Sequence, residues 1–253
     1  MKFIKIKTRA LLPPKDDIYP ILDLYLPKLH EGDVVLITSK ILAIHQGRCL
    51  PIGNINKDDL IFRESERYIP RSKVPHQYVI LTVKDYTLIP SSGIDESNAN
   101  GHYILWPKNT VKLLKEIRAY LKKKNKIKNL ALIATDSHTT PLRRGVNGIS
   151  IGFYGMEPLY DYRGKKDIFG RKLKMTQTNI VDALSSMAVF LMGEGNERIP
   201  IVIIRGLGNI KFTAKDTYKK LVIPPSEDIY YPLLKSFRSK KNAKDNRNRG
   251  SKR

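Results

Sequence analysis

Residues 130–148, LALIATDSHTTPLRRGVNG, place five apolar residues directly before a polar segment that contains glycine. An unbroken apolar run of this length is typical of a strand that is buried on both faces. The polar segment that follows such a strand is where α/β enzymes often place functional side chains. The stretch therefore predicts a central strand over Leu130–Ala134, with a candidate site immediately after it.

Other segments along the chain have β-rich or helical character. The expected strands are Lys2–Lys7, Asp33–Thr38, Tyr78–Val83 and Ile199–Ile204. The expected helices are Ile18–Leu26, Thr110–Lys124 and Ile180–Met192, and Asp16–Asp17 give the first helix an acidic start. This mixture predicts an α+β (mixed α/β) fold, with mixed sheets and flanking helices, although periodicity leaves the topology open.

Composition limits the class of protein. The 253 residues are 41% hydrophobic and include a single cysteine, Cys49, which excludes an internal disulfide. No segment approaches the roughly 20 apolar residues of a membrane span, and the N-terminus lacks the apolar run of a signal peptide. We therefore expect a cytoplasmic protein without membrane contact. Residues 1–235 are expected to form the catalytic region, as one domain or two intertwined subdomains.

The chain is strongly basic, because 46 Lys and Arg against 24 Asp and Glu give a net charge of +22. Few aliphatic side chains occur near the C-terminus, so residues 236–253 are predicted to form a disordered basic tail. A second basic cluster covers the solvent side of the helix expected around 112–128. Nucleic acid could bind the tail, but the sequence has no DNA- or RNA-reading motif, so a solvated basic surface is favoured.

Asp95 and Asp136 are the strongest candidates for metal ligands. Two carboxylates brought to one point offer the hard oxygen atoms that Mg²⁺ or Mn²⁺ prefers, and the hydroxyls of Thr135 and Ser137 can add neutral oxygens. A metal held in this way would bridge nucleotide phosphates. Taken alone, an Asp in a loop rich in Gly, Ser and Asn is as readily explained by an Asx turn or a helix cap.

Two further groups of residues suit anionic ligands. Arg143 and Arg144 can grip a carboxylate or phosphate through paired N–H groups, although surface salt bridges would explain them equally. The segment MGEG follows an apolar helix, so Gly193 suits a helix C-terminal cap. Gly195 would then allow close approach of a ligand, and Glu194 is available as a base or a metal ligand.

The order and content of these segments resemble the family of coenzyme F-420 glutamate ligases. The resemblance extends from near the N-terminus to about residue 210. It rests on EGDVVLITSKI (31–41), QGR (46–48), ESER (64–67), GIDESN (93–98), TDSHTTPLRRGVNGISIGFYG (135–155), DYRGKKDIFGRKLKMTQ (161–177), VDAL (181–184), LMGEG (191–195) and IPIVIIRG (199–206). GIDESN and the D-S…RRG…G…IG…G run are specific in combination.

The resemblance implies the glutamate-ligase-type fold of that family and a homodimer whose active site lies near the interface. It implies a ligase that uses GTP and divalent cations, Mg²⁺ or Mn²⁺ with K⁺ as a further candidate, to join the amino group of L-glutamate to a carboxylate of the deazaflavin precursor. A carboxylate is a poor electrophile, so activation as an acyl phosphate is expected. Ile151, Phe153 and Tyr154 are the apolar candidates for the interface.

By position, the resemblance assigns the metal to Asp95, Asp136 and Ser137. The expected catalytic residues are Arg143, Arg144 and Glu194. Nucleotide contacts are expected from Arg9, Ala10, Leu11, Leu12, Ser39, Lys40, Asn98, Met192, Gly193 and Gly195. The sequence departs from the family pattern in TRALLPP (8–14), which lacks a glycine, and at Ile44, where a basic residue is expected near phosphate. Lys40 or His45 would have to compensate.

Two alternatives stay open. The same chemistry could act on a folate-type pterin or another small carboxylate, because no residue pattern here reads the deazaflavin ring. A protein of another class, a non-catalytic nucleic-acid-binding protein, would fit the net charge of +22 and Ile44. The presence of Asp95, Asp136 and Ser137 argues against that second alternative.

Overall fold

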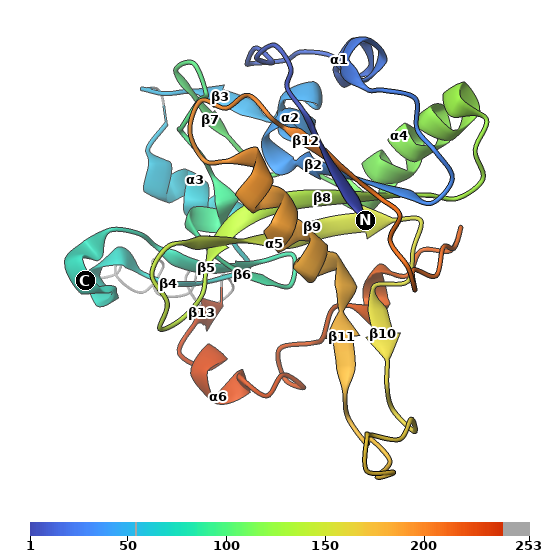
Figure 1. The fold of residues 1–253 in the computed structure, drawn as a ribbon. Helices are drawn as coiled ribbons and strands as arrows, with labels where there is room; N and C mark the ends of the chain where they lie inside the picture. The colour runs from blue at the N-terminus through green and yellow to red at the C-terminus, as the bar shows by residue number, and fades with distance from the viewer. Residues whose placement is uncertain (54, 240–253) are drawn as a thin grey trace, which may run out of the picture.

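A five-stranded mixed sheet lies at the centre of the computed structural model, which describes residues 1–53 and 55–239 (Figure 1). Its order is β1-β12-β2-β8-β9, formed by β1 (Lys2–Ile6), β12 (Ile201–Arg205), β2 (Asp33–Thr38), β8 (Leu130–Thr139) and β9 (Val146–Tyr154). β2 and β8 run parallel, whereas the other neighbouring pairs run antiparallel. The mixed sheet and its flanking helices confirm the predicted α+β fold.

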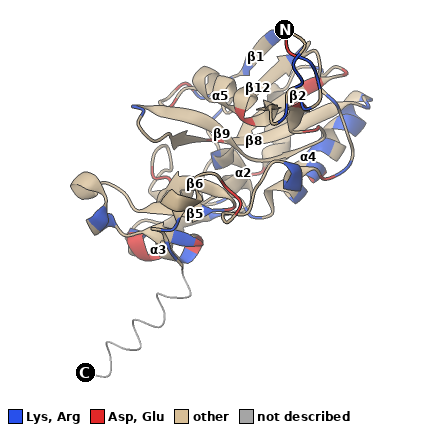
Figure 2. Cartoon of the chain, turned by 90° about the horizontal axis from the view of Figure 1, so that it is seen from below, with Lys and Arg blue, Asp and Glu red and all other residues tan. Residues whose placement is uncertain are grey.

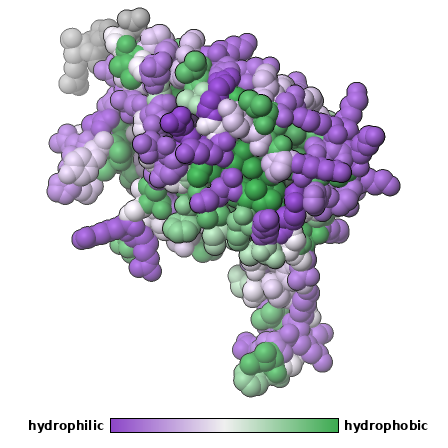
Figure 3. Space-filling model, turned by 45° about the horizontal axis from the view of Figure 1, so that its top comes forward, coloured by the Kyte–Doolittle hydropathy of each residue, from purple (hydrophilic) through white to green (hydrophobic). Residues whose placement is uncertain are grey.

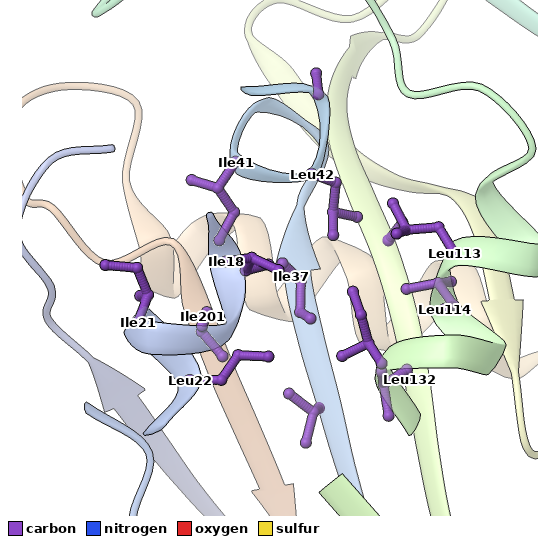
Figure 4. Packing of buried hydrophobic residues seen from close by; sticks show 14 of the residues in the cluster. Ile18, Ile21, Leu22, Ile37, Ile41, Leu42, Leu113, Leu114, Leu132 and Ile201 are labelled. Atoms are coloured by element: carbon purple, nitrogen blue, oxygen red, sulfur yellow. The ribbon is translucent and has the colours of Figure 1, made fainter. Parts of the chain in front are cut away.

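The core lies on both faces of this sheet, because side chains along a strand alternate between faces. Val35 and Ile37 of β2 pack in a cluster with α1 (Ile18–Tyr25), α2 (Ser39–His45) and α4 (Thr110–Asn125), as Figure 4 shows in part. Val34 and Leu36 pack on the opposite face against α5 (Ile180–Met192). All four side chains are fully buried, which explains why their stretch of sequence is continuously apolar.

Smaller elements surround the central sheet. A second sheet has the order β13-β4-β5-β6, and a third pairs β3 with β7. These strands are β4 (Arg67–Ile69), β5 (Leu81–Lys84), β6 (Thr87–Pro90), β13 (Arg238–Ser239), β3 (Cys49–Pro51) and β7 (His102–Ile104), with α3 (Lys57–Glu64) and α6 (Tyr231–Leu234) as the remaining α-helices described. β10 (Leu159–Asp161) and β11 (Gln177–Asn179) form an arm that projects from the body (Figure 1).

The predicted helices agree with the structure to within one residue at each end. Asp17 is the N-cap of α1, where its carboxylate accepts a hydrogen bond from the backbone N–H of Tyr19 at 3.1 Å. The strand predicted at Tyr78–Val83 instead begins at Leu81, and Tyr78 is exposed. β8 continues to Thr139, beyond its predicted end, because β9 pairs with its polar half as well.

The structured chain also continues past residue 236, the predicted start of the basic tail. β13 pairs with β4, with Arg238 opposite Tyr68 and Ser239 opposite Arg67. Backbone pairing at the edge of a sheet needs no apolar side chains, so composition alone could not predict it. The rest of the predicted tail, 240–253, lies outside the described residues.

The basic face predicted on the long helix is present on α4. Leu114, Ile117 and Leu121 are buried on its inner side, and Lys115 and Lys123 are exposed on its outer side (Figure 2). Within residues 1–53 and 55–239, no helix is both long and apolar enough to cross a membrane.

Candidate active site

A cavity of about 630 Å³ lies where segments from several parts of the chain converge. Ligand pockets in proteins commonly have volumes of this size. Its walls come from the segment after β1, the junction of β2 and α2, the loop before β7, the middle of β8 and the loop after α5. The corresponding residues are 8–12, Thr38 with Lys40, Asp95 with Ser97, Asn98 and Asn100, Asp136 with Ser137, and 192–200.

The parallel pairing of β2 and β8 explains why two of these walls meet. Thr38 lies opposite Thr135 in the register, so the start of α2 and the polar half of β8 emerge at the same edge of the sheet. A β-bulge between Ala134 and Thr135 changes the direction of β8 at that edge. The apolar part of β8 predicted as a strand, Leu130–Ala134, is therefore followed within the same strand by Asp136 and Ser137, which line the cavity.

Asp136 forms the inner carboxylate of the cavity. Its Oδ2 accepts a hydrogen bond from the indole N–H of Trp106, and its Oδ1 accepts one from the backbone N–H of Ser137 at 2.9 Å. Burial raises the pKa of Asp136 to about 6, against the opposing effect of these two hydrogen bonds. Above that pH the carboxylate is ionised, so it can bind a cation.

Asp95 forms a second carboxylate beside Lys40. Lys40 Nζ lies 2.7 Å from Asp95 Oδ2, and the backbone N–H of Ser97 donates to Asp95 Oδ1 at 2.7 Å. Burial alone would raise the pKa of Asp95, but the charge of Lys40 and these hydrogen bonds outweigh it and lower the pKa. The negative charge of Asp95 in turn raises the pKa of Asp136, which shows that the two carboxylates interact.

The loop after α5 closes the cavity. Gly193 is the C-cap of α5, as predicted, and its φ of +76° and the 2.3 Å that would separate a Cβ from Glu197 Cδ both favour glycine. Glu197 Oε2 accepts from the backbone N–H of Gly195 at 2.9 Å. Asn98 Nδ2 donates to the carbonyl oxygen of Gly195 at 3.0 Å, so Asn98 joins this loop to the loop of Asp95.

Glu194 lies on the exposed rim of the cavity. Reduced contact with water raises the pKa of its carboxyl, and the charges of Asp95 and Glu197 act in the same direction. The charge of Lys40 and a hydrogen bond with Ser137 oppose that rise. The carboxylate of Glu194 is therefore more basic than that of a glutamate in water. It lies at the mouth of a cavity that also contains the carboxylates of Asp95 and Asp136.

The structure brings most of the predicted site residues together, because thirteen of them line this one cavity: Arg9, Ala10, Leu11, Leu12, Lys40, Asp95, Asn98, Asp136, Ser137, Met192, Gly193, Glu194 and Gly195. Ser39 is buried at the first turn of α2 and does not line it. Arg143 and Arg144 lie in the exposed turn between β8 and β9, and neither lines the cavity of this chain.

Sequence reasoning did not find several residues at the cavity. Thr8, Thr38, Asn100 and Arg198 line it, and the indole of Trp106 contacts Asp136 behind it. Ser97 was detectable, because its spacing from Asp95 is that of an Asx turn. Nothing in the sequence around Trp106 indicated a role at the site, because its contact with Asp136 depends on the tertiary fold.

Of the two side chains suggested to compensate for Ile44, only Lys40 lines the cavity. Ile44 lines the cavity as an apolar side chain, and Lys40 lines it as a cation. His45 does not line the cavity, and its Nδ1 instead accepts from the backbone N–H of Ile18 at 3.3 Å. Compensation by Lys40 therefore stays a prediction, and Arg9 and Arg198 are further cations that line the cavity.

The donor set suits a small divalent cation that shares its ligands with a phosphate. In the described part of the chain, no three His, Cys, Asp or Glu side chains are close enough to hold a metal ion by themselves. Mg²⁺ is usually held by one or two carboxylates, with phosphate and water oxygens completing the octahedron. Asp95, Asp136 and Ser137 fit that requirement. Thr135 is fully buried and does not line the cavity.

Comparison with known proteins places this chain in a family of ligases. The family model described as F420-0:gamma-glutamyl ligase matches residues 5–206. The chain is 32% identical over 219 residues to the coenzyme F420:L-glutamate ligase of Methanocaldococcus jannaschii, an alignment that covers 80% of this chain and 86% of that relative. It is 30% identical to the protein of the same name from Methanopyrus kandleri, with 80% and 87% covered. The chain belongs to the F420-0:gamma-glutamyl ligase family.

Proposed function

We propose that this protein joins L-glutamate, through an amide bond, to a carboxylate of the deazaflavin coenzyme F420 or its precursor. The observation that supports this most is the convergence of Asp95, Asp136 and Lys40 on one cavity, in a chain whose relatives are named coenzyme F420:L-glutamate ligases. Two carboxylates beside a fixed cation suit the binding of a phosphate together with a divalent metal. Nucleoside triphosphate, L-glutamate and a small carboxylate acceptor are the proposed ligands.

Mg²⁺ or Mn²⁺ would be held by Asp95, Asp136 and the hydroxyl of Ser137. When bound, the cation would offset the negative charge of the phosphate oxygens. Lys40, 2.7 Å from Asp95 Oδ2, would contribute a second positive charge. K⁺ stays a further candidate cation, proposed on family resemblance alone.

The nucleotide would occupy the space between residues 8–12 and the loop after α5. Both segments line the cavity, and they are joined where the backbone N–H of Thr8 donates to the carbonyl oxygen of Arg198 at 2.9 Å. Arg9 is held there by Asp16, with 3.0 Å between Nη2 and Oδ1. GTP is proposed in preference to ATP because of the family resemblance.

The proposed reaction has two steps. An acceptor carboxylate oxygen attacks the terminal phosphorus of the nucleotide, the bond from that phosphorus to the bridging oxygen breaks, and the nucleoside diphosphate leaves. The glutamate amine then attacks the acyl carbon of the acyl phosphate, the carbon–oxygen bond to phosphate breaks, and phosphate leaves. Glu194, with its raised pKa, would accept the proton that the amine loses. Arg143 and Arg144 are proposed to orient an anionic group of a substrate.

A homodimer is proposed as the working form. Large apolar side chains are exposed on α5, where Phe190 is 80% exposed, and in the arm, where Phe169 is 89% exposed. Figure 3 shows hydrophobic surface at the tip of the projecting arm. Exposed apolar surface of this kind favours a protein partner. The interface candidates from the sequence are wrong, since Ile151, Phe153 and Tyr154 are buried within the chain as parts of β9.

Incubation with GTP, Mn²⁺ and L-glutamate, with one acceptor at a time, tests the proposed substrate. The acceptors are the deazaflavin precursor, a folate-type pterin and a simple aliphatic carboxylate, and products are read by mass spectrometry. We expect the mass of one glutamate residue to be added to the deazaflavin. Addition to the pterin alone would assign the chemistry to a different acceptor, and no addition to any acceptor would contradict the proposed function.

A further inference from the structure

The single tryptophan of the chain, Trp106, contacts the inner carboxylate of the cavity. It is 2% exposed and belongs to the apolar cluster between the central sheet and α4. From within that cluster its indole N–H donates to Asp136 Oδ2. The indole therefore provides a directed polar contact in addition to its apolar packing.

The indole is fixed by charged residues on its far side. Arg48 Nε donates to the carbonyl oxygen of Trp106 at 3.2 Å, and Lys84 Nζ lies 5.7 Å from the centroid of the ring. Arg48 and Lys84 are both paired with Glu64, each at 2.7 Å. Because the backbone and the ring of Trp106 are both held, the direction of its N–H is set before a ligand binds.

The same indole packs against the segment that carries the other carboxylate. Gly93, two residues before Asp95, has a φ of +67°, and a Cβ at this position would lie 2.1 Å from Trp106 Nε1. The backbone at Gly93 thus approaches the indole as closely as only glycine allows. Trp106 therefore makes two contacts at the site. Its N–H donates to Asp136, and the edge of its indole ring packs against the backbone of Gly93, which limits where the segment that carries Asp95 can lie.

We propose that Trp106 is a positioning residue for the metal site, which holds the carboxylate of Asp136 in a fixed orientation relative to the Asp95 segment. With one partner on each oxygen of Asp136, the carboxylate cannot rotate freely, and its remaining lone pairs stay available at the cavity wall. This inference rests on the proposed function, because it takes Asp95 and Asp136 as the metal ligands. Loss of a residue that orients a metal ligand typically weakens metal binding 10–100-fold.

Trp106→Phe tests the inference, because it keeps an aromatic ring and removes the N–H. Tyr103→Phe is the matched control, since Tyr103 is buried in the neighbouring strand β7 and makes no contact with either carboxylate. Binding of Mn²⁺ is measured directly from the electron paramagnetic resonance signal of the free ion. We expect the Kd for Mn²⁺ to rise about tenfold or more in Trp106→Phe and to stay unchanged in Tyr103→Phe.

A kinetic measurement separates positioning from a general loss of structure. In Trp106→Phe the concentration of Mn²⁺ needed for half-maximal activity should rise, whereas kcat at saturating Mn²⁺ should return close to that of the wild type. Equal affinity for Mn²⁺ in the wild type and in Trp106→Phe would overturn the inference and leave the metal site intact. A wild type that binds no Mn²⁺ would overturn the metal site, and the inference with it.

The fluorescence of the wild-type protein gives a second test that needs no variant. Trp106 is the only tryptophan of the chain, so tryptophan emission comes from this side chain alone. Paramagnetic Mn²⁺ bound at Asp136 should quench that emission, with the same Kd as the resonance measurement. Emission that does not change while the resonance signal shows bound Mn²⁺ would overturn the inference, even if Trp106→Phe fails to fold.

Discussion

The ammonium group of Lys40 lies 2.7 Å from the carboxylate of Asp95, and it also donates to the carbonyl oxygen of Ser97 at 2.8 Å. The cavity therefore presents a fixed positive charge next to one of its two carboxylates before any ligand binds. Among the cations that line the cavity, Lys40 is the one that pairs with a proposed metal ligand, so we propose that it receives a phosphate.

Lys40→Met should weaken the binding of GTP in the presence of Mg²⁺ by about tenfold or more, because it removes one charge-assisted hydrogen bond to the phosphate. Isothermal titration calorimetry measures this change. Lys57→Met is a matched control, because Lys57 pairs with Glu96 and does not line the cavity. If Lys40→Met binds GTP as tightly as the wild type does, Lys40 is not a phosphate ligand.

Glu64→Gln should lower the free energy of unfolding by roughly 3 kcal/mol, because it leaves Lys84 without a charged partner at 8% side-chain exposure. Asp58→Asn removes a more exposed pair, with Arg71, and should cost less than about 1 kcal/mol. Chemical denaturation at neutral pH measures both values. A cost for Glu64→Gln no larger than that for Asp58→Asn would contradict the stabilising role of Glu64.

The effect of Glu64 should also depend on pH. Burial would raise the pKa of Glu64, but Lys84 and Arg48 outweigh it and lower the pKa below its ordinary value of 4.5. A carboxyl with a lowered folded-state pKa stabilises the protein above its unfolded pKa, and this contribution is lost as pH falls through the folded pKa. The difference in stability between the wild type and Glu64→Gln should therefore shrink as pH falls below 4.5. A difference that stays constant down to roughly pH 2 would contradict this assignment.

Phe190→Glu should convert a dimer to a monomer, because it places a charge on the exposed apolar side of α5. Leu24→Glu is the matched control, as Leu24 is 74% exposed on α1. Light scattering gives the mass of each variant in solution. Because each chain has a net charge of +22, added salt should strengthen association of the wild type by screening repulsion. A wild type that stays monomeric at low and high salt would contradict the homodimer.

Oxygen-18 in the acceptor carboxylate should appear in the released phosphate. One carboxylate oxygen becomes the bridge of the acyl phosphate, and it leaves with phosphate when the amine attacks the acyl carbon. Mass spectrometry of the inorganic phosphate measures this transfer, and unlabelled acceptor in labelled water is the control. Release of unlabelled phosphate during amide formation would rule out an acyl phosphate.

The central sheet was predictable because its strands are continuous apolar runs. Val34–Ile37 has no polar residue, so burial on both faces was the simplest explanation of the sequence. The order of the strands within the sheet was not predictable. β1 pairs with β12, which joins residues about 200 positions apart, and local periodicity contains no information about such long-range pairing. The strand at 238–239 was missed for the same reason.

The candidate site was predictable where polar residues directly follow a strand or a helix. Asp136 follows the apolar part of β8, and Gly193 ends α5, so both gave local signals. Trp106 acts through a contact across the fold, with Asp136, which a single sequence does not reveal. Glu197 contacts its near neighbour Gly195, but the local sequence gave no signal for that contact. Arg143 and Arg144 gave a strong local signal but lie in an exposed turn, so their predicted role in catalysis stays a prediction.

The most direct test of the central claim is Mn²⁺-dependent addition of glutamate to the deazaflavin acceptor by four proteins, read by mass: the wild type, Asp95→Asn, Asp136→Asn and Asp161→Asn. Asp161 lies on the exposed arm and pairs with Arg163, so it serves as the control. Asparagine keeps the size of each side chain and removes a charged oxygen ligand. We predict product from the wild type and from Asp161→Asn, no product after chelation of the metal, and none from Asp95→Asn or Asp136→Asn, with all four proteins folded. Near-normal product from Asp95→Asn or Asp136→Asn at limiting Mn²⁺ would contradict the account.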